Sequence, residues 1–163
     1  MTAAGEDRLR ALEERVAHLE DQLALYRLVS TYGPAVDTGS SRAAGALWDD
    51  EGVYEFDTSR LDGPDGIAAM VEGRGHQGLI RNGCAHVMAM PVVTVDGDTA
   101  RATGYSRVYR HVGDGYEVWR VSANHWEFRR TPAGWKVTRR VNRTLDGSEE
   151  ARQILRHGVD GGT

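Results

Sequence analysis

The sequence contains a single cysteine, Cys84, and no run of about 18 apolar residues. One cysteine excludes an internal disulfide bond, and the apolar neighbours of Cys84 favour a small core residue over a nucleophile. Without a long apolar run, no membrane-spanning helix is expected, and the charged N-terminal segment does not resemble a signal peptide. We therefore expect a cytoplasmic protein that does not act at a membrane.

Several features of binding proteins and enzymes are also missing. The sequence has no P-loop and no G-x-S-x-G elbow, so the nucleotide and serine-hydrolase sites that use them are not expected. The six histidines show no metal-ligand spacing, and no metal or cofactor is predicted. Four of the six histidines, including His76, are expected in loops or at the surface. The net charge of -4 argues against nucleic acid, because phosphate contacts need a basic face.

Length and composition indicate one globular domain. The chain has 163 residues, of which 40% are hydrophobic and 27% are charged, which allows a substantial core. We divide it into an N-terminal helical extension (1–19), a main domain (20–147), and a C-terminal helix and tail (148–163). Ser148 is the predicted N-cap of that last helix.

The first 32 residues are predicted to form a helix. Apolar residues recur there at intervals of three and four, the a/d pattern of a coiled coil nearly three heptads long: Leu9, Leu12, Val16, Leu19, Leu23 and Tyr26. The helix either lies on its own domain or extends past it, over residues 6–22, to pair with another chain. We expect a homo-oligomer, a dimer or trimer. Gly33-Pro34 is predicted to kink or break the helix.

The remaining elements indicate an α+β fold. Helices are predicted over 41–48 and 67–72 and a short strand over 53–56, and the glycine-rich stretch 73–83 is expected to give one helical turn and a loop. Strands over 84–95 and 99–112 are joined by a hairpin at Asp96-Gly97, and strands over 116–130 and 135–145 follow. The pattern predicts a four-strand antiparallel meander, curved and covered on one face by helices.

The long strand 116–130 carries a candidate pocket wall. Side chains alternate between the two faces of a strand, and its even positions include small polar and then aromatic residues: Ser122, Asn124, Trp126 and Phe128. Such a face suits a pocket with a few placed hydrogen-bonding groups. The odd positions, Trp119 included, are expected to face solvent or another subunit. Alternatively, Trp126 and Phe128 are core residues, and Ser122 and Asn124 satisfy backbone groups.

Three further residues could carry chemistry. His86 lies in an apolar run, so it is either a core histidine or, if it lines a pocket, the natural general base. Asp37 is either a turn residue or a buried carboxylate that orients a histidine ring. His111 ends its strand, where alternation turns it away from the predicted pocket and a bulge would reverse it.

Five segments together resemble the SnoaL-like branch of the nuclear-transport-factor-2-like (NTF2-like) superfamily, over roughly residues 20–145. They are the helix with Tyr32 and Asp37, the step from Ala46 to Tyr54, His86 opening a strand, the turn Val95-Asp96-Gly97-Asp98, and Arg130 to Val137. The resemblance implies a cone-shaped, curved antiparallel sheet covered by N-terminal helices, a cystatin-like roll. This fold hosts many activities.

Within the superfamily, the pocket is most similar to those of scytalone dehydratase and the bile-acid dehydratases. The first resemblance implies an active-site aspartate at Asp37, catalytic histidines at His86 and at or beside His111, and pocket residues at Ser122 and Asn124. Scytalone dehydratase holds a water molecule with two tyrosines. Val36 occupies the position of one of these tyrosines, and either Phe56 or Tyr54 occupies the position of the other. The bile-acid enzymes imply roles for Tyr32, Asp37 and His86; their further aspartate has no clear equivalent.

The function expected from this resemblance is a cofactor-independent lyase, isomerase or cyclase acting on a small apolar ringed substrate. His86 would remove a proton α to a carbonyl, Asp37 would orient the ring, and Tyr32 or Tyr54 would donate a hydrogen bond to the enolate. His86 or His111 would protonate a departing hydroxyl, against an aromatic wall that includes Phe56. The alternative is a non-catalytic protein that binds a small ligand or serves as a subunit of an assembly.

Overall fold

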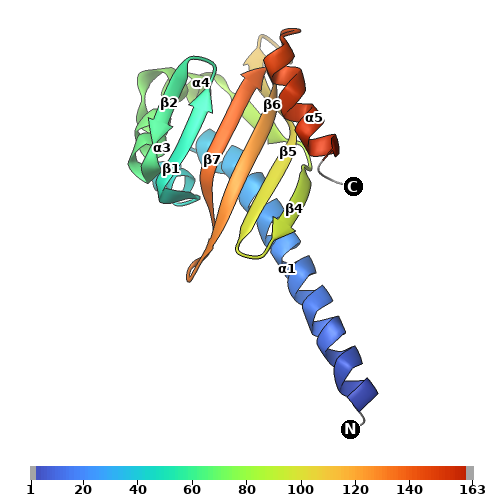
Figure 1. Cartoon of the computed structure of the whole chain (residues 1–163). Helices are drawn as coiled ribbons and strands as arrows, with labels where there is room; N and C mark the ends of the chain where they lie inside the picture. Colours follow the sequence, from blue (N-terminus) through green and yellow to red (C-terminus); the bar gives the residue numbers. More distant parts are fainter. Residues whose placement is uncertain (1–2, 161–163) are drawn as a thin grey trace.

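A helix of 35 residues, α1 (Ala3–Asp37), opens the structure, a computed structural model that describes residues 3–160. Its N-terminal half projects away from the rest of the molecule, and its C-terminal half passes behind the sheet (Figure 1). Its buried residues all lie between Leu25 and Val36. The apolar side chains of Leu9, Leu12, Val16, Leu19 and Leu23 are therefore about half exposed.

Three short helices follow α1 and are spread through the first half of the chain: α2 (Ser41–Gly45), α3 (Gly63–Glu72) and α4 (Arg74–Asn82). Pro64 lies in the first turn of α3, where its missing N–H removes no helical bond. Gly73, Gly75 and Gly78 have the G-x-G-x-x-G spacing, but α4 follows a helix rather than a strand, so they do not form a dinucleotide-binding turn. None of the helices within residues 3–160 is long and apolar enough to cross a membrane.

The described residues form one curved sheet of seven strands, in the order β2-β1-β7-β6-β5-β3, with β4 also paired to β5. The strands are β1 (Trp48–Phe56), β2 (Ser59–Asp62), β3 (Cys84–Met88), β4 (Val92–Asp96), β5 (Thr99–Val112), β6 (Gly115–Thr131) and β7 (Gly134–Thr144). All pairs are antiparallel except β1 with β7. The predicted α+β fold with a curved sheet is confirmed, but helices cover both faces of the sheet rather than the one face that was predicted.

The two faces of the sheet are covered by helices from opposite ends of the chain. On one face, α1 and α3 pack on a core whose largest fully buried apolar side chains are Trp48, Trp126 and Phe128. On the other face lies α5 (Glu149–Asp160), where Ala151 and Ile154 meet a smaller cluster with Ala123 and Val141 (Figure 1). Ser148 precedes α5 and its Oγ accepts a long bond of 3.5 Å from an amide in the first turn. Residues 161–163 of the predicted tail lie outside the described residues.

Several predicted boundaries differ from the structure. Pro34 does not break α1, because it lies in the last turn, where its own carbonyl still accepts the amide of Thr38 at 3.1 Å. The predicted strand 84–95 is two strands, separated by the segment that ends at Pro91, and the predicted helix 41–48 ends early because Trp48 already begins β1. The strand β2 and most of α4 were not predicted, because short polar and glycine-rich segments carry little periodicity.

Gly33 allows α1 to approach β3 closely. A Cβ atom at this position would lie 2.0 Å from the backbone carbonyl oxygen of His86, a contact that no side chain can make. Because both partners of that contact are backbone, the helix and the strand must separate if the position carries any side chain. Glycine at this one position therefore sets the distance between the end of α1 and β3.

We expect Gly33→Ala to lower the free energy of unfolding by roughly 1–3 kcal/mol, the usual effect of overpacking a core. Gly75→Ala in α4 is the matched control, since a Cβ there meets nothing within 4 Å and alanine favours a helix over glycine by about 1 kcal/mol. Chemical denaturation of the three proteins measures both effects. Equal stability of Gly33→Ala and the wild type would contradict the close approach.

Candidate active site

A carboxylate at the end of α1 is hydrogen-bonded to a histidine on β3. The Nδ1 atom of His86 lies 2.5 Å from Oδ1 of Asp37, and the backbone amide of His86 donates to Oδ2 at 2.7 Å. Both side chains are mostly buried, with 13% of His86 and 19% of Asp37 exposed. Two bonds from one residue to both oxygens fix the carboxylate and the ring in one orientation.

The surroundings keep this carboxylate ionised. Burial alone would raise the pKa of Asp37, but the bonds from the His86 ring and amide, the imidazole itself and the Cys84 thiol together hold that pKa below its ordinary value. Burial and the neighbouring carboxylate raise the pKa of Cys84 to about 12, so the thiol stays protonated and donates to Asp37 at 3.3 Å. Because an ionised carboxylate only accepts, Nδ1 of His86 carries a proton, and in the uncharged ring Nε2 is the nitrogen that can act as a base.

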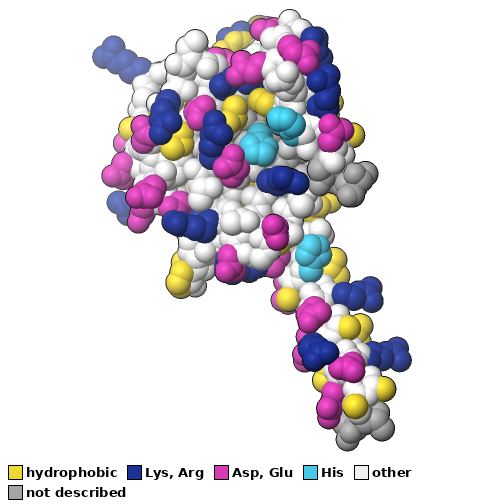
Figure 2. Space-filling view, in the orientation of Figure 1, with side chains coloured by type: hydrophobic (Ala, Val, Ile, Leu, Met, Phe, Trp, Pro, Cys, Tyr) yellow, Lys and Arg dark blue, Asp and Glu magenta, His cyan; other side chains and the backbone are white. Residues whose placement is uncertain are grey.

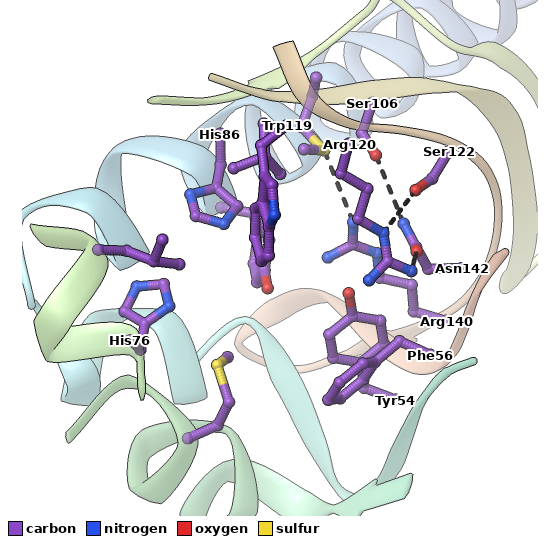
Figure 3. Close-up of a pocket in the computed structure, with 15 residues that line it drawn as sticks. Tyr54, Phe56, His76, His86, Ser106, Trp119, Arg120, Ser122, Arg140 and Asn142 are labelled. Carbon is purple, nitrogen blue, oxygen red and sulfur yellow. Dashed lines mark hydrogen bonds between the residues drawn. The ribbon is translucent and has the colours of Figure 1, made fainter. Parts of the chain in front are cut away.

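The ring of His86 lines a cavity of about 150 Å³ between the helices and the concave side of the sheet. The other lining residues come from α1, α3, α4 and five strands, and are Tyr32, Tyr54, Phe56, Met70, His76, Leu79, Met88, Ser106, Val108, Trp119, Arg120, Ser122, Arg140 and Asn142. Figure 3 shows His86 and His76 on one side of this space and the guanidinium groups of Arg120 and Arg140 on the other. The cavity has room for about one ring and its substituents.

His76 is a second imidazole beside the first. Its Nε2 donates to the backbone carbonyl of Val36 at 2.8 Å, and its ring centroid lies 5.3 Å from that of His86. Burial is the main reason that the pKa of His76 is lowered, and the neighbouring His86 adds to the effect. His76 is therefore neutral near pH 7, with Nδ1 left as a hydrogen-bond acceptor at the cavity.

The structure brings most of the predicted site residues together. Asp37 and His86 are bonded to each other, and Tyr32, Tyr54, Phe56 and Ser122 line the cavity. Both candidates for the second tyrosine position, Tyr54 and Phe56, are therefore at the wall. Burial raises the pKa of the Tyr32 hydroxyl, so this group keeps its proton and can donate.

Four predicted site residues lie elsewhere. Trp126 and Phe128 are core residues beneath the cavity, 1% and 2% exposed, and Asn124 lies behind the wall with its oxygen bonded to Arg140. His111 is exposed at the end of β5, where its ring packs against Tyr116. The core alternative for the two aromatic residues is thus the one that the structure shows.

A bulge explains both the position of His111 and a residue that the pattern missed. Val108 of β5 pairs with Arg120 of β6, and Tyr109 pairs with Val118, so Trp119 is the extra residue. Because the bulge lies on β6, alternation on β5 is unchanged and His111 stays outside. On β6, Trp119 joins Arg120 at the cavity instead of facing outward.

Two other residues that line the cavity, His76 and Arg140, could not be recognised as site residues from the sequence pattern. His76 belongs to a glycine-rich stretch that was expected to be a loop, but α4 carries it to the cavity. Arg140 lies in the run Arg139-Arg140, which is typical of a solvated strand edge, yet it is 1% exposed. Its position on the inner face of β7 follows from the strand register, which a charge pattern does not reveal.

The groups around Asp37 could also be compared with a metal site. Asp37, Cys84 and His86 offer ligand atoms within 4.8 Å of one another. Nδ1 of His86 and Oδ1 of Asp37 are bonded directly to each other, and the thiol of Cys84 is a protonated donor. The arrangement fits a histidine held by a carboxylate better than it fits a set of metal ligands.

Comparisons with known proteins agree with this architecture. A family model described as a SnoaL-like domain matches residues 17–141. The chain is 43% identical to an NTF2-like protein with a cystatin-like fold from Novosphingobium aromaticivorans, over 90% of this chain and 96% of that one, with a TM-score of 0.88. No match was found among curated proteins.

Two further structures from the same organism are more distant. One, proposed to be an aromatic ring hydroxylase, is 27% identical over 78% of this chain and 90% of its own, with a TM-score of 0.64. The other, proposed to be a scytalone dehydratase, is 16% identical over 78% and 86%, with a TM-score of 0.67. At 16% identity the likeness shows the fold alone.

The lowered pKa of Asp37 has a consequence for stability. A carboxylate whose pKa is depressed in the fold stabilises it above the unfolded pKa, and this contribution is lost as the pH falls through the folded pKa. We expect Asp37→Asn to be less stable than the wild type by roughly 1–3 kcal/mol at neutral pH, and this difference should shrink below the ordinary value of 3.8. Urea unfolding between pH 7 and pH 3 measures it.

Asp114→Asn, in the exposed β5–β6 turn, is the control and should unfold like the wild type at every pH. A difference between Asp37→Asn and the wild type that stays constant down to pH 3 would show that the carboxylate is not held ionised.

Proposed function

The chain belongs to the SnoaL-like family of the NTF2-like superfamily, and from this premise we propose that it is a cofactor-independent enzyme in which His86 removes a proton α to a carbonyl. The substrate is a small, mostly apolar, ringed molecule. The single observation that carries the proposal is the bond of 2.5 Å between Asp37 and a histidine ring that lines a cavity. A histidine that only fills the core needs a hydrogen-bond partner, but it needs neither a mostly buried carboxylate as that partner nor a cavity beside its ring.

Each member of the pair has a defined role. Nε2 of His86 takes the proton, and Asp37 holds the ring in the tautomer that leaves Nε2 free and stabilises the imidazolium that forms. The hydroxyl of Tyr32 donates a hydrogen bond to the developing enolate oxygen, which its raised pKa permits at neutral pH. A positioned base of this kind contributes about 10²–10⁴-fold to the rate.

Dehydration follows from the same arrangement. The C–H bond breaks, its proton moves to Nε2, and its electron pair forms the enolate. The enolate electrons then form a C=C bond as the C–O bond of a β-hydroxyl breaks, and the imidazolium returns the proton so that water leaves. His111 has no part in this step, because it lies outside the cavity. Nδ1 of His76 accepts a hydrogen bond from the hydroxyl group before it departs.

Isomerisation and cyclisation begin with the same proton abstraction, so the first test concerns that step alone. In D₂O, the enzyme should exchange the α-hydrogens of a suitable cyclic ketone for deuterium, whichever reaction follows. A panel of one- and two-ring ketones can be followed by NMR or mass spectrometry. The neighbour proposed to be a scytalone dehydratase supports including β-hydroxy ketones, whose loss of water is read in the same experiment.

We expect His86→Ala to lower the exchange rate by about 10²–10⁴-fold and Asp37→Asn to lower it by a smaller factor. His111→Ala is the matched control and should exchange at the wild-type rate, because this imidazole lies outside the cavity. A wild-type exchange rate in His86→Ala would contradict the assignment of His86 as the base. Ketones that bind without any exchange would favour a non-catalytic ligand-binding protein.

A further inference from the structure

The wall opposite His86 holds a buried guanidinium that has no carboxylate partner. Arg140 is 1% exposed, and none of the ion pairs within residues 3–160 includes it. An arginine cannot lose its proton at any ordinary pH, and an unpaired charge in a protein interior is costly. The neighbouring arginines all have acids: Arg120 lies 2.9 Å from Asp57, and Arg139 and Arg143 both bond glutamates.

Neutral groups hold Arg140 in place. Its Nε and Nη2 donate to Oδ1 of Asn124 at 3.1 and 2.8 Å, and Nη2 lies 3.8 Å from the sulfur of Met88. The guanidinium carbon lies over three rings, 4.3 Å from the centroid of Tyr32, 4.5 Å from Tyr54 and 4.2 Å from Trp126. These contacts fix the plane of the group and leave its charge uncancelled.

One nitrogen of this group is left over. Nη1 is buried and has no hydrogen-bond partner among the described residues, although the side chain lines the cavity. Figure 3 shows the guanidinium groups of Arg140 and Arg120 across the space from His86. A buried, charged donor without a partner, on a side chain that lines a cavity, is a group whose missing hydrogen bond an acceptor atom of a ligand would supply.

We propose that Arg140 is the site's anion-binding residue and that the ligand is a flat, ringed molecule with one anionic oxygen at Nη1. This deepens the proposed function: the oxygen is that of the ketone, which becomes negative as His86 takes the proton. Arg140 is then a catalytic residue in the strict sense, because it touches the reacting group. The substrate class narrows to ringed ketones whose enolate, like a phenolate, lies in the plane of the ring.

The charges of the two walls support this assignment. Two guanidiniums and the one carboxylate of Asp57 leave a single positive charge on the arginine side. On the other side, the base form of His86 that the mechanism uses leaves the ionised Asp37 as a single negative charge. Proton transfer changes both together: the imidazolium balances Asp37, and the enolate balances Arg140. Electrostatic stabilisation that matches the transition state in this way is usually the largest catalytic term.

A nitrophenol tests the site without any turnover. 4-Nitrophenol ionises near neutral pH and its phenolate absorbs visible light, so binding of each form can be read from spectra across a pH series. We expect the wild type to bind the phenolate at least about tenfold more tightly than the phenol, which lowers the ionisation pKa of the bound probe by about one unit. 4-Nitroanisole, which cannot ionise, should bind without this pH dependence.

Arg140→Met should lose the preference for the phenolate, because methionine fills similar space without charge. Arg42→Met, on the exposed surface of α2, is the matched control and should keep it. If Arg140→Met does not fold, the comparison of nitrophenol with nitroanisole on the wild type decides alone. Equal binding of both forms, no binding of the phenolate at millimolar concentration, or a preference that survives in Arg140→Met would overturn the proposal.

His86→Ala separates this inference from the proposed function. It should lower ketone exchange by about 10²–10⁴-fold and retain the phenolate preference. Loss of exchange with no phenolate preference in the wild type contradicts the role of Arg140 alone. A phenolate preference with undiminished exchange in His86→Ala contradicts the proposed base alone.

A separate observation concerns the projecting part of α1. Its a and d side chains are about half exposed: Leu9 46%, Leu12 46%, Val16 53%, Leu19 61% and Leu23 48%. Figure 2 shows apolar side chains among acidic and basic ones along this segment. The domain holds α1 by another face, since Asp21, at an f position, bonds Arg130 at 2.6 and 2.7 Å. The row of a and d side chains from Leu9 to Leu23 (the seam) is therefore not used to bind the helix to its own domain.

The charges beside the seam select one partner and one orientation. The g positions Arg8 and Arg15 are basic and the e positions Glu13 and Glu20 are acidic, and no ion pair within residues 3–160 uses any of the four. In a parallel pair of identical helices, each g residue meets the e residue five positions later on the other helix. Arg8 then faces Glu13 of the second copy and Arg15 faces Glu20. In an antiparallel pair, like charges would meet.

We infer that α1 forms a parallel two-stranded coiled coil with a second copy of this chain, through residues 8–26. Valine at the central a position and leucine at two d positions favour two strands. Light scattering on the full chain should give twice its 17.9 kDa mass. A mass of one or three chains would overturn the inference.

Charge reversal tests the orientation. The double variants Arg8→Glu/Arg15→Glu and Glu13→Arg/Glu20→Arg should each dissociate, and an equimolar mixture should form dimers again. In addition, Leu12→Cys should cross-link two copies on oxidation, because equivalent d positions adjoin only in a parallel pair, whereas Ala11→Cys, off the seam, should not. Variants that remain dimeric alone, or a Leu12→Cys protein that does not cross-link, would contradict the parallel pairing.

Discussion

The hydrogen bond between the carboxylate of Asp37 and the ring of His86 joins the last residue of α1 to β3, which ends the strand order of the sheet. It depends on two features of the helix end. Gly33 lets the backbone of α1 approach the carbonyl of His86, and the helix continues through Pro34 for the one turn that brings Asp37 into reach. The site is thus built where helix and strand touch, and its geometry is set by backbone packing rather than by flexible loops.

The cavity beside this bond is electrically asymmetric. Its histidine side includes an ionised carboxylate, and its arginine side includes a guanidinium that only neutral groups hold. Without a ligand, the protein gains no stability from holding these two charges on opposite sides of the cavity. The arrangement becomes favourable when negative charge moves from one side to the other, which is what proton abstraction from a carbonyl compound does. Burial of Arg140 without an acid is therefore easier to explain by function than by stability.

The family and the fold class could be predicted from the sequence because they rest on patterns that persist along the chain. Apolar periodicity located the long helix, and the turn at Asp96-Gly97 located a hairpin that the structure contains. The pair of Asp37 and His86 was predicted from the family resemblance. Their contact could not have been derived from spacing, because the two residues are 49 positions apart in the sequence. From the local sequence alone, Asp37 could equally be a turn residue and His86 a core residue.

What the sequence could not supply were the details of register. One extra residue on β6 brings Trp119 to the cavity, and because β5 has no such residue, His111 stays outside. A bulge of this kind leaves no mark in composition or alternation. The same holds for Arg140, which reads as a solvated strand residue and lies buried because β7 is central in the sheet. Charged residues turned inward are the exceptions to patterning, and they concentrate at functional sites.

The central claim is that Asp37 fixes His86 with its proton on Nδ1 and a lone pair on Nε2. Nitrogen-15 NMR of the imidazole side chains, with the signals assigned through His86→Ala, reports the protonation of each nitrogen directly. The account predicts that the uncharged ring of His86 carries its proton on Nδ1, with that proton strongly deshielded, and has an unprotonated Nε2. An uncharged ring with its proton on Nε2 and a bare Nδ1 would contradict it.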